Sequence, residues 1–348
     1  MTIFDVPNYG AMLQAYALQR ALEALGHDAV AINYTNQHLD GVYRVGVFPP
    51  RPTKWLRSRR ARAFVRDHVR TSGSRLRSVD DVARVAEQYD VLVTGSDQVW
   101  FTGPVQGYDP VYFLDLPGVG TPRISYAPSA GATSNFGSDG PRIRQVLSGY
   151  AAISVRDEFT EAVVRTVTDR PLARVVDPVL LHDFAEVRDS HLAWRPVREP
   201  YLAVFGNLDT RAASLAREVA ASLKLRLVTL QYRLNGGTRV PAPDPWQWMA
   251  ALRNASCVVT TYFHGAVVPL KFGVPVLCFP TKNRVPKVTA LLRDAGVTGA
   301  LVPATPAEAL YAVEAQRAGR AAEESLGPKI AASREWLARS LAEVMQPS

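Results

Sequence analysis

His264 is the residue of the sequence best suited to proton transfer. It stands in Phe263-His264-Gly265, between a predicted strand at Ser256–Thr260 and a predicted helix at Gly265–Phe272. An imidazole changes its protonation state near neutral pH, so a histidine in a ligand site can donate or accept a proton. At a strand-to-helix turn, backbone amides and the helix dipole also favour an anion. The alternative is a histidine that only fills or caps this turn.

Arg156 is a candidate anchor for an anionic ligand. It follows the apolar run Ala151–Val155, a predicted strand, so its side chain is expected at the carboxyl end of that strand. A guanidinium can bind a carboxylate or a phosphate through two parallel hydrogen bonds. The alternative is an ion pair with Asp157 or Glu158, which would make Arg156 a structural residue.

A second group of cations follows the predicted strand Pro275–Phe279. The loop beyond it carries Lys282, Arg284 and Lys287, and the sequence has no Asp or Glu from His264 to Arg293. Such a loop favours a ligand rich in phosphate. The alternative is a set of solvated surface cations.

Asp97 is a candidate base. It lies in the turn Gly95-Ser96-Asp97, after the predicted strand Asp90–Thr94. Its carboxylate could orient a hydroxyl group or accept its proton. Aspartate is also favoured as an N-cap, so capping of a following helix is the alternative.

These residues require two alternating sets of strands and helices. In the first set, an apolar stripe from Ala11 to Leu25 predicts a helix that Gly26 ends, and the predicted strands are Asp28–Tyr34, Asp90–Thr94, Arg123–Ala127, Ala151–Val155 and Arg174–Val176. In the second set, the predicted strands are Tyr201–Gly206, Leu225–Leu230, Ser256–Thr260 and Pro275–Phe279, and the predicted helices are Arg211–Leu223, Pro245–Asn254 and Gly265–Phe272. This alternation is typical of parallel sheets covered by helices.

The same pattern predicts the domain organisation. We expect an N-terminal α/β domain at 1–180, a linker at 181–200 and a C-terminal α/β domain at 201–315. A helical tail at 316–348, interrupted or kinked at Gly327-Pro328, could pack back on the N-terminal domain. Two such domains predict a ligand cleft between the carboxyl ends of their sheets.

The composition excludes several classes of protein. The 348 residues exceed one ordinary domain, and 47% hydrophobic and 21% charged residues are typical of a globular chain. There is no uncharged apolar run of about 18 residues and no charged-then-apolar leader, which favours a cytoplasmic protein. Cys257 and Cys278 are expected to be reduced core residues, and they predict no zinc site.

The net charge of +8 is concentrated in one basic segment. From Arg51 to Arg77 there are ten Lys or Arg and one acid, Asp67, so this window carries +9 and the remainder 8 − 9 = −1. This distribution argues against a uniformly basic nucleic-acid binder. It predicts either a solvated helical face or a patch for an anionic surface, such as a phosphate-bearing lipid carrier or membrane headgroups. None of these charges follows a predicted strand, so the segment is expected to lie apart from the ligand site.

Several short motifs, in this order, resemble the polysaccharide pyruvyl transferase family. They cover roughly residues 5 to 295 and comprise Asn8-Tyr9-Gly10-Ala11 leading into LQAYAL, GSDQVW (Gly95–Trp100), SYAPSAG (Ser125–Gly131), SVRD (Ser154–Asp157), VVDPVLL (Val175–Leu181) and FHG (Phe263–Gly265). The resemblance implies an α/β fold of two Rossmann-like domains facing a cleft, as in glycosyltransferase-B enzymes. It also implies transfer of a pyruvate group from phosphoenolpyruvate to sugar hydroxyls as a ketal, for polysaccharides of the cell envelope.

Residue chemistry and the resemblance together predict the site. The expected catalytic residues are His264 and Asp97; the expected donor-binding residues are Arg156, Gly265, Lys282, Arg284 and Lys287; the expected acceptor-binding residues are Asn8, Tyr9 and Ser129. No metal or cofactor is expected besides phosphoenolpyruvate as co-substrate. The expected partners are a sugar or glycan acceptor, which could be lipid-linked, but no nucleic acid. The inner face of the membrane is a candidate location through 51–77.

The sequence departs from the family's usual motifs at two places. Thr261 and Tyr262 stand where an acidic residue and a serine usually precede Phe-His-Gly, and Phe101 follows GSDQVW where asparagine is usual. Two other functions stay open: a glycosyltransferase-B enzyme that uses a nucleotide sugar, and a non-catalytic relative that binds an anionic glycan. The first would need a carboxylate near His264 to hold a ribose, and the stretch from His264 to Arg293 has none.

Overall fold

The chain forms two compact α/β units. The computed structural model describes residues 1–36, 38, 41, 52–103, 107–319 and 321–346. Unit 1 consists of Met1–Val45, Ala61–His182 and Lys329–Ser348, and unit 2 of Gly46–Arg60 and Asp183–Pro328. The predicted linker at 181–200 therefore lies largely in unit 2, and the basic segment is divided between the units. Arg51, the first residue of that segment, lies outside the described residues.

Unit 1 contains a parallel sheet in the order β1-β2-β3-β4. Its strands are β1 (Leu92–Thr94), β2 (Arg123–Ser125), β3 (Ala152–Val155) and β4 (Ala173–Arg174). They run in consecutive order and in parallel, so each connection crosses a face of the sheet, and all carboxyl ends lie at one edge.

One predicted strand is wrong. Residues 28–34 form only isolated bridges, between Ala31 and Thr71 and between Tyr34 and Leu76. The backbone pairs with the segment after α3 (Pro52–His68), since Ala31 donates to the carbonyl of Arg70 at 2.9 Å. The alternation of apolar residues at 28–34 correctly indicated which side chains are buried. It could not show that the pairing segment after α3 is irregular and forms no regular strand.

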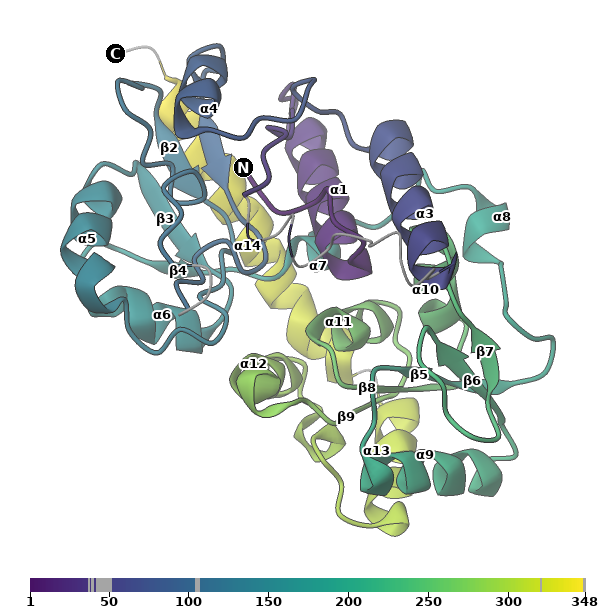
Figure 1. The fold of residues 1–348 in the computed structure, drawn as a ribbon. Helices are drawn as coiled ribbons and strands as arrows, with labels where there is room; N and C mark the ends of the chain where they lie inside the picture. The colour runs from purple at the N-terminus through teal and green to yellow at the C-terminus, as the bar shows by residue number, and fades with distance from the viewer. Residues whose placement is uncertain (37, 39–40, 42–51, 104–106, 320, 347–348) are drawn as a thin grey trace. The chain divides into compact units, whose positions relative to one another are not determined.

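Helices cover both faces of the first sheet. They are α1 (Tyr9–Ala24), α4 (Val79–Ala86), α5 (Gly140–Ser148), α6 (Glu158–Arg165), α7 (Pro178–Leu181) and the later part of α14 (Ala321–Met345), with a 3-10 turn at Gly137–Asp139. Leu18 of α1, Ile124 of β2 and Leu341 of α14 share one apolar cluster. Figure 1 shows α14 running along one face of this sheet, with α5 and α6 on the other. Pro328 lies inside α14, so the predicted interruption is wrong, and a kink at this position stays a prediction.

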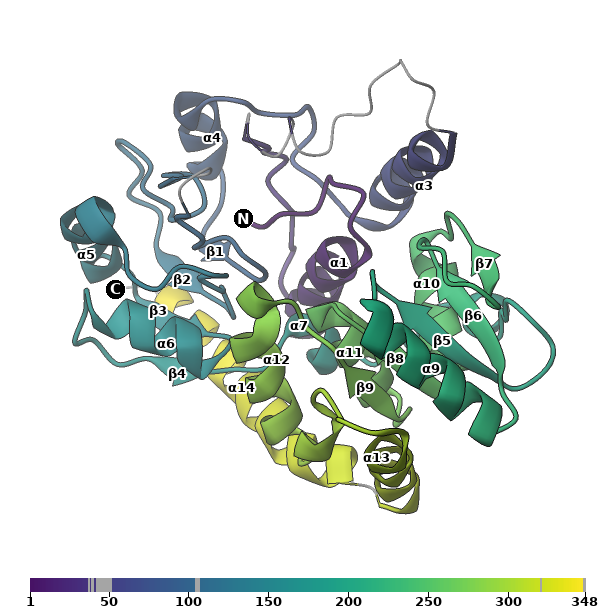
Figure 2. The ribbon, with the colours of Figure 1, turned by 60° about the horizontal axis from the view of Figure 1, so that its bottom comes forward.

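Unit 2 contains a parallel sheet in the order β7-β6-β5-β8-β9 (Figure 2). Its strands are β5 (Tyr201–Phe205), β6 (Arg226–Leu230), β7 (Thr238–Val240), β8 (Cys257–Thr260) and β9 (Val276–Cys278). Four were predicted, and the short β7 was missed. The strand order reverses between β5 and β8, and open parallel sheets bind ligands outside the carboxyl ends at such a switch point.

The second sheet is also covered on both faces. Its helices are α8 (Asp189–Leu192), α9 (Thr210–Ser222), α10 (Pro245–Arg253), α11 (Phe263–Lys271), α12 (Val285–Asp294) and α13 (Pro306–Ala318), with 3-10 turns at Lys282–Arg284 and Thr298–Ala300. Leu215 of α9 and Val313 of α13 pack with Val204 and Val259 in one cluster. Trp248 of α10 contacts Phe205, with ring centroids 5.1 Å apart.

The prediction for the two cysteines is confirmed. Cys257 and Cys278 are free thiols, buried on the neighbouring strands β8 and β9. Burial raises the pKa of Cys257 to about 12, so this thiol stays protonated at neutral pH. Separately, the described helices include none with both the length and the apolar character to cross a bilayer.

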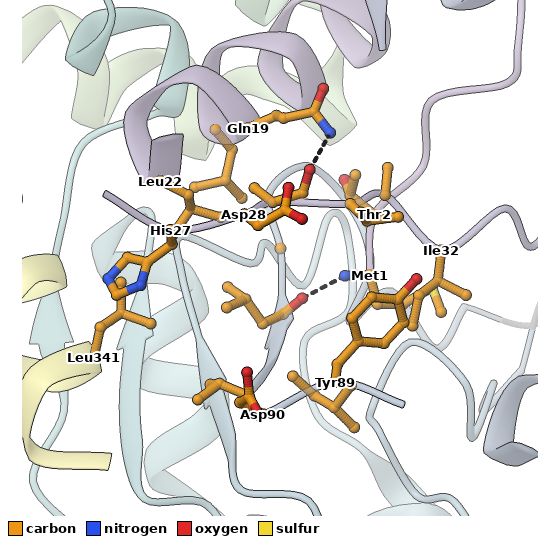
Figure 3. Close-up of a pocket in the computed structure, with 18 of the residues that line it drawn as sticks. Met1, Thr2, Gln19, Leu22, His27, Asp28, Ile32, Tyr89, Asp90 and Leu341 are labelled. Carbon is orange, nitrogen blue, oxygen red and sulfur yellow. Dashed lines mark hydrogen bonds between the residues drawn. The ribbon is translucent and has the colours of Figure 1, made fainter. Parts of the chain in front are cut away.

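Met1 extends the first sheet beside β1. Its amino group donates to the carbonyl of Val93, and Gly95 donates to the carbonyl of Met1 at 3.0 Å, the pattern of a parallel ladder. A cavity of about 180 Å³ lies next to this pairing, with Leu22, Ile32 and Leu341 among its lining residues (Figure 3). Burial lowers the pKa of the Met1 amino group to about 5.

This burial predicts a pH-dependent stability for a protein whose first residue is Met1. In the unfolded chain the amine has an ordinary pKa near 8, so between about pH 8 and pH 5 unfolding takes up a proton. The free energy of unfolding should therefore fall as the pH falls from 8 to 6, which urea unfolding measures.

A matched pair of variants isolates the amine. Placing Gly-Ser-Gly before Met1 should abolish this part of the pH dependence. Placing Val-Ile-Val there should also abolish it, and should raise stability by extending the ladder beside β1. The same fall in stability in all three proteins would contradict the assignment to the Met1 amine.

Candidate functional site

In unit 1 the carboxyl edge of the sheet collects one polar residue from each strand. Asp97 follows β1, Ser129 follows β2, Arg156 follows β3 and Asp177 follows β4. Asp97 and Ser129 are joined by a backbone hydrogen bond of 2.7 Å from the Ser129 amide to the Asp97 carbonyl. Three of the four residues were predicted from the sequence, and Asp177 was not.

Arg156 lies in a buried cluster of carboxylates. Its Nη1 is 3.0 Å from an oxygen of Asp177 and 3.8 Å from one of Asp97, and its Nε is 3.9 Å from one of Asp157. The Arg156 side chain is 2% exposed. Three carboxylates within 4 Å therefore offset the charge of this cation. These contacts favour Arg156 as a residue that holds the aspartates in place, and its role in binding a donor stays a prediction.

Asp97 does not cap a helix, so that alternative is wrong. It has a positive φ of 64°, and the described residues that follow it form a turn. Gln14 of α1 holds the loop by accepting from the Ser96 amide at 3.2 Å, and Ser96 Oγ donates to the Ala127 carbonyl at 2.9 Å. The Asp97 carboxylate remains 15% exposed. It can therefore reach a ligand at this edge while its backbone is fixed.

The three predicted acceptor residues have identifiable local roles. Asn8 is exposed and caps α1, accepting from the amides of Gly10 at 3.1 Å and Ala11 at 3.4 Å. Tyr9 is 2% exposed and Ser129 is 1% exposed. The amide group of Asn8 is the most accessible of these side chains. Acceptor binding by all three stays a prediction.

At the switch point of unit 2, the backbone at two glycines lies very close to threonine side chains. A Cβ atom at Gly265 would lie 2.1 Å from Thr260 Oγ1, and one at Gly206 would lie 2.2 Å from Thr261 Oγ1. Both distances are far below van der Waals contact, so glycine is needed for α11 to pack on β8 and β5. Packing alone explains Gly265, and ligand binding by its backbone stays a prediction.

His264 lies in the first turn of α11 and is 9% exposed. Its ring meets that of Phe263 edge to face, with centroids 5.3 Å apart. Lys287 of α12 is also buried, and its Nζ lies 5.8 Å from the centroid of the Phe263 ring. The structure thus holds the predicted acid–base residue at the strand-to-helix turn where the sequence predicted it.

The three predicted loop cations differ in environment. Lys282 is exposed, Arg284 is half-buried and Lys287 is buried. Arg284 lies over the ring of Tyr262, with Cζ 4.5 Å from the centroid, and its Nη1 donates to Thr281 Oγ1 at 3.0 Å. Arg284 therefore has two neutral partners, one after β8 and one after β9. We call the residues that follow β5, β6, β8 and β9 the switch-point edge.

Sequence reasoning missed a tyrosine pair at this edge. The hydroxyls of Tyr232, after β6, and Tyr262, after β8, are 2.5 Å apart, and their rings stack with centroids 6.3 Å apart. Burial, and then the hydrogen bond with Tyr232, raise the pKa of Tyr262 well above its usual value. The phenol is therefore neutral at physiological pH. The unusual tyrosine before Phe-His-Gly was the available sequence signal.

Sequence reasoning also misplaced part of the basic segment. Arg57 of α3 donates through Nη1 to Gln231 Oε1, at 3.1 Å, beyond the end of β6, and its charge acts on Tyr262. Arg60 donates to the carbonyl of Ala242 and to Gln247 at 3.4 Å. The expectation that all these charges lie apart from strand-end turns is wrong for Arg57. Arg57 and Gln231 are 174 residues apart in the sequence, so no local sequence pattern could have predicted their contact.

Comparisons with known proteins agree with this architecture. A family model described as polysaccharide pyruvyl transferase matches residues 8–283. The solved UDP-GlcNAc 2-epimerase from Methanocaldococcus jannaschii is similar with a TM-score of 0.54 and 11% identity, covering 87% of this chain and 89% of that one. The enzyme of the same name from Neisseria meningitidis, bound to UDP-GlcNAc, has a TM-score of 0.52 and 8% identity, covering 95% and 96%.

A further solved structure is larger than this chain. An O-GlcNAc transferase mutant from Thermobaculum terrenum is 16% identical with a TM-score of 0.43; the match covers 96% of this chain and 62% of that one. No curated protein matches the chain significantly. At such low identities, the likeness to the epimerases shows the fold alone: two Rossmann-like units, as in glycosyltransferase-B enzymes.

The buried cluster predicts a large cost for removing its cation. Arg156→Met would leave Asp97, Asp157 and Asp177 without their charge partner, so the free energy of unfolding should fall by about 3–5 kcal/mol. The matched control is Arg174→Met, whose guanidinium is 55% exposed and pairs with Glu161 at 3.5 Å. That change should cost at most about 1 kcal/mol. Urea unfolding compares the two, and equal small losses would show that Arg156 does not hold the cluster.

Proposed function

Because the chain belongs to the polysaccharide pyruvyl transferase family, a family of transferases, we propose that it moves a pyruvate group from phosphoenolpyruvate onto two hydroxyl groups of a sugar or glycan. The products are a cyclic ketal and inorganic phosphate. The observation that carries the proposal is the pair Arg57 and Arg284, two arginines with neutral partners at the switch-point edge of unit 2.

The charge of this edge suits phosphoenolpyruvate. The donor has a carboxylate and a phosphate and so needs at least two cationic anchors. Arg57 donates to the neutral Gln231, and Arg284 contacts Thr281 and the Tyr262 ring, so neither charge is cancelled by these partners. The first turn of α11 adds backbone amides that favour an anion. Arg156 contrasts with them, since its charge is already offset by carboxylates.

The same edge is poorly suited to the alternative donor. A nucleotide-sugar enzyme of this fold would use a carboxylate to bind the ribose hydroxyls, and no Asp or Glu occurs from His264 to Arg293. Lys282 is exposed and Lys287 is buried against Phe263, so we assign the main anchoring role to Arg57 and Arg284. The proposed donor set also includes Lys282, Lys287 and Gly265, with smaller contributions.

The proposed reaction needs proton transfer at two kinds of atom. His264 gives a proton to the methylene carbon of phosphoenolpyruvate, which becomes a methyl group, and the adjoining carbon becomes oxocarbenium-like. One sugar hydroxyl attacks that carbon and loses its proton, for which Asp97 is the proposed base. Phosphate then leaves, and the second hydroxyl closes the ketal and loses its proton. The two hydroxyl protons balance the methyl group and the hydrogen phosphate, and phosphoenolpyruvate is the sole co-substrate invoked.

The acid–base role of His264 predicts a separation of turnover from folding. His264→Gln keeps a side chain of similar size, so the melting temperature should stay near that of the wild type. Release of phosphate from phosphoenolpyruvate, measured over a panel of sugar acceptors, should fall by about 10²–10⁴-fold. Affinity for the donor should change less, because the imidazole acts mainly in the transition state. A folded variant with full activity would exclude His264 as the proton donor.

The donor assignment predicts unequal effects of two neighbouring cations. Arg284→Gln should raise KM for phosphoenolpyruvate by about 10–100-fold, the effect of losing one charge-assisted hydrogen bond. Lys282→Gln removes the same charge from an exposed side chain two residues away and should change KM by less than about 5-fold. Phosphate-release assays with both variants make the comparison. Equal effects would mean that only the general charge of the loop matters.

A further inference from the structure

Helix α3 has one face that contacts the protein and one that does not. Ala61, Phe64 and Val65 are buried, and Arg57 and Arg60 bond to groups of unit 2. The remaining side chains at Lys54, Trp55, Arg59 and Arg62 are exposed. Positions 55, 59 and 62 are separated by four and three residues, so they form one stripe along the helix. We call these four residues the α3 basic face.

Trp55 is the feature that separates this face from an ordinary charged surface. It is 55% exposed, whereas Trp100 and Trp248 are fully buried. The guanidinium of Arg59 lies 5.8 Å from its ring centroid. An indole that is more than half exposed packs less against the protein than the buried tryptophans do. Tryptophan beside basic residues is typical of helices that lie in a membrane interface.

Among the residues that the structure describes, no ion pair offsets the charge of the α3 basic face. Within the described part of the chain, no carboxylate lies within 4 Å of the charged groups of Lys54, Arg59 or Arg62. Asp67, the acid of this helix, pairs with Arg66 at 2.8 Å. A helix face that exposes three cations and an indole is complementary to a surface of anionic headgroups, which offers both negative charge and an apolar boundary for the indole.

We propose that the α3 basic face binds the surface of a membrane that contains anionic phospholipids. The basic residues contact the headgroups, and the indole of Trp55 inserts at the boundary with the acyl chains. Membrane binding by the α3 basic face is independent of pyruvyl transfer, because none of its four residues belongs to the proposed donor or acceptor sites. The proposed membrane-binding surface is smaller than the basic segment predicted from the sequence. It excludes Arg57 and Arg60, whose guanidinium groups donate hydrogen bonds within the protein.

The test is co-sedimentation of the full chain with vesicles of phosphatidylcholine alone or mixed with phosphatidylglycerol. The wild type should bind the mixed vesicles, bind the neutral ones far more weakly, and lose binding as salt is added. Arg59→Gln with Arg62→Gln should lower partitioning by roughly 30-fold, since each basic residue near the surface contributes about 5-fold. Trp55→Ala should lower partitioning as well and should abolish the blue shift of tryptophan emission on binding.

The matched control is Arg144→Gln with Arg217→Gln, which removes the same charge from exposed positions on α5 and α9. This control should bind as the wild type does, and melting temperatures should confirm that all variants are folded. Equal loss of binding in both double variants would overturn the proposal, because charge alone would then be responsible. Binding to single-stranded DNA but not to the mixed vesicles would also overturn it, in favour of a nucleic-acid partner.

Discussion

The close approach of the first turn of α11 to β8 and β5 is the constraint on which the switch-point edge of unit 2 depends. Thr260 Oγ1 donates to the Phe205 carbonyl at 2.7 Å, and that hydroxyl occupies the space that a side chain at residue 265 would need. Glycine at this position therefore fixes where α11 begins. His264 and Tyr262 flank that point, so their placement follows from the packing of two strands and one helix.

The arginines of the two units differ in the charge of their surroundings. Arg156 lies among three aspartates and offers little net charge to an anion, so its contribution is to fix Asp97 at the edge of the first sheet. Arg57 and Arg284 have neutral partners and keep their charge available. Sequence motifs alone favoured Arg156 as the anion anchor, and the burial and distances favour the other two.

Much of the fold was predictable because parallel strands buried on both faces give short apolar runs between turn residues. Eight of the nine strands in the described part of the chain were predicted, and His264 and Asp97 were placed correctly after β8 and β1. Apart from the short β7, the main failures have one physical origin, which is contact between segments that are distant in the sequence. Residues 28–34 pair with an irregular stretch, Asp177 completes the cluster around Arg156, and Arg57 reaches the end of β6 from another helix. Local periodicity carries no information on such contacts.

We propose above that Arg57 and Arg284, the two arginines with neutral partners, bind phosphoenolpyruvate. Isothermal titration calorimetry of the wild type and of Arg57→Gln with phosphoenolpyruvate tests it most directly, with UDP-GlcNAc as the competing ligand class. We expect saturable binding of phosphoenolpyruvate to the wild type, affinity lower by about 10–100-fold in Arg57→Gln, and much weaker binding of UDP-GlcNAc. Unchanged affinity in Arg57→Gln, or tighter binding of UDP-GlcNAc than of phosphoenolpyruvate, would contradict it.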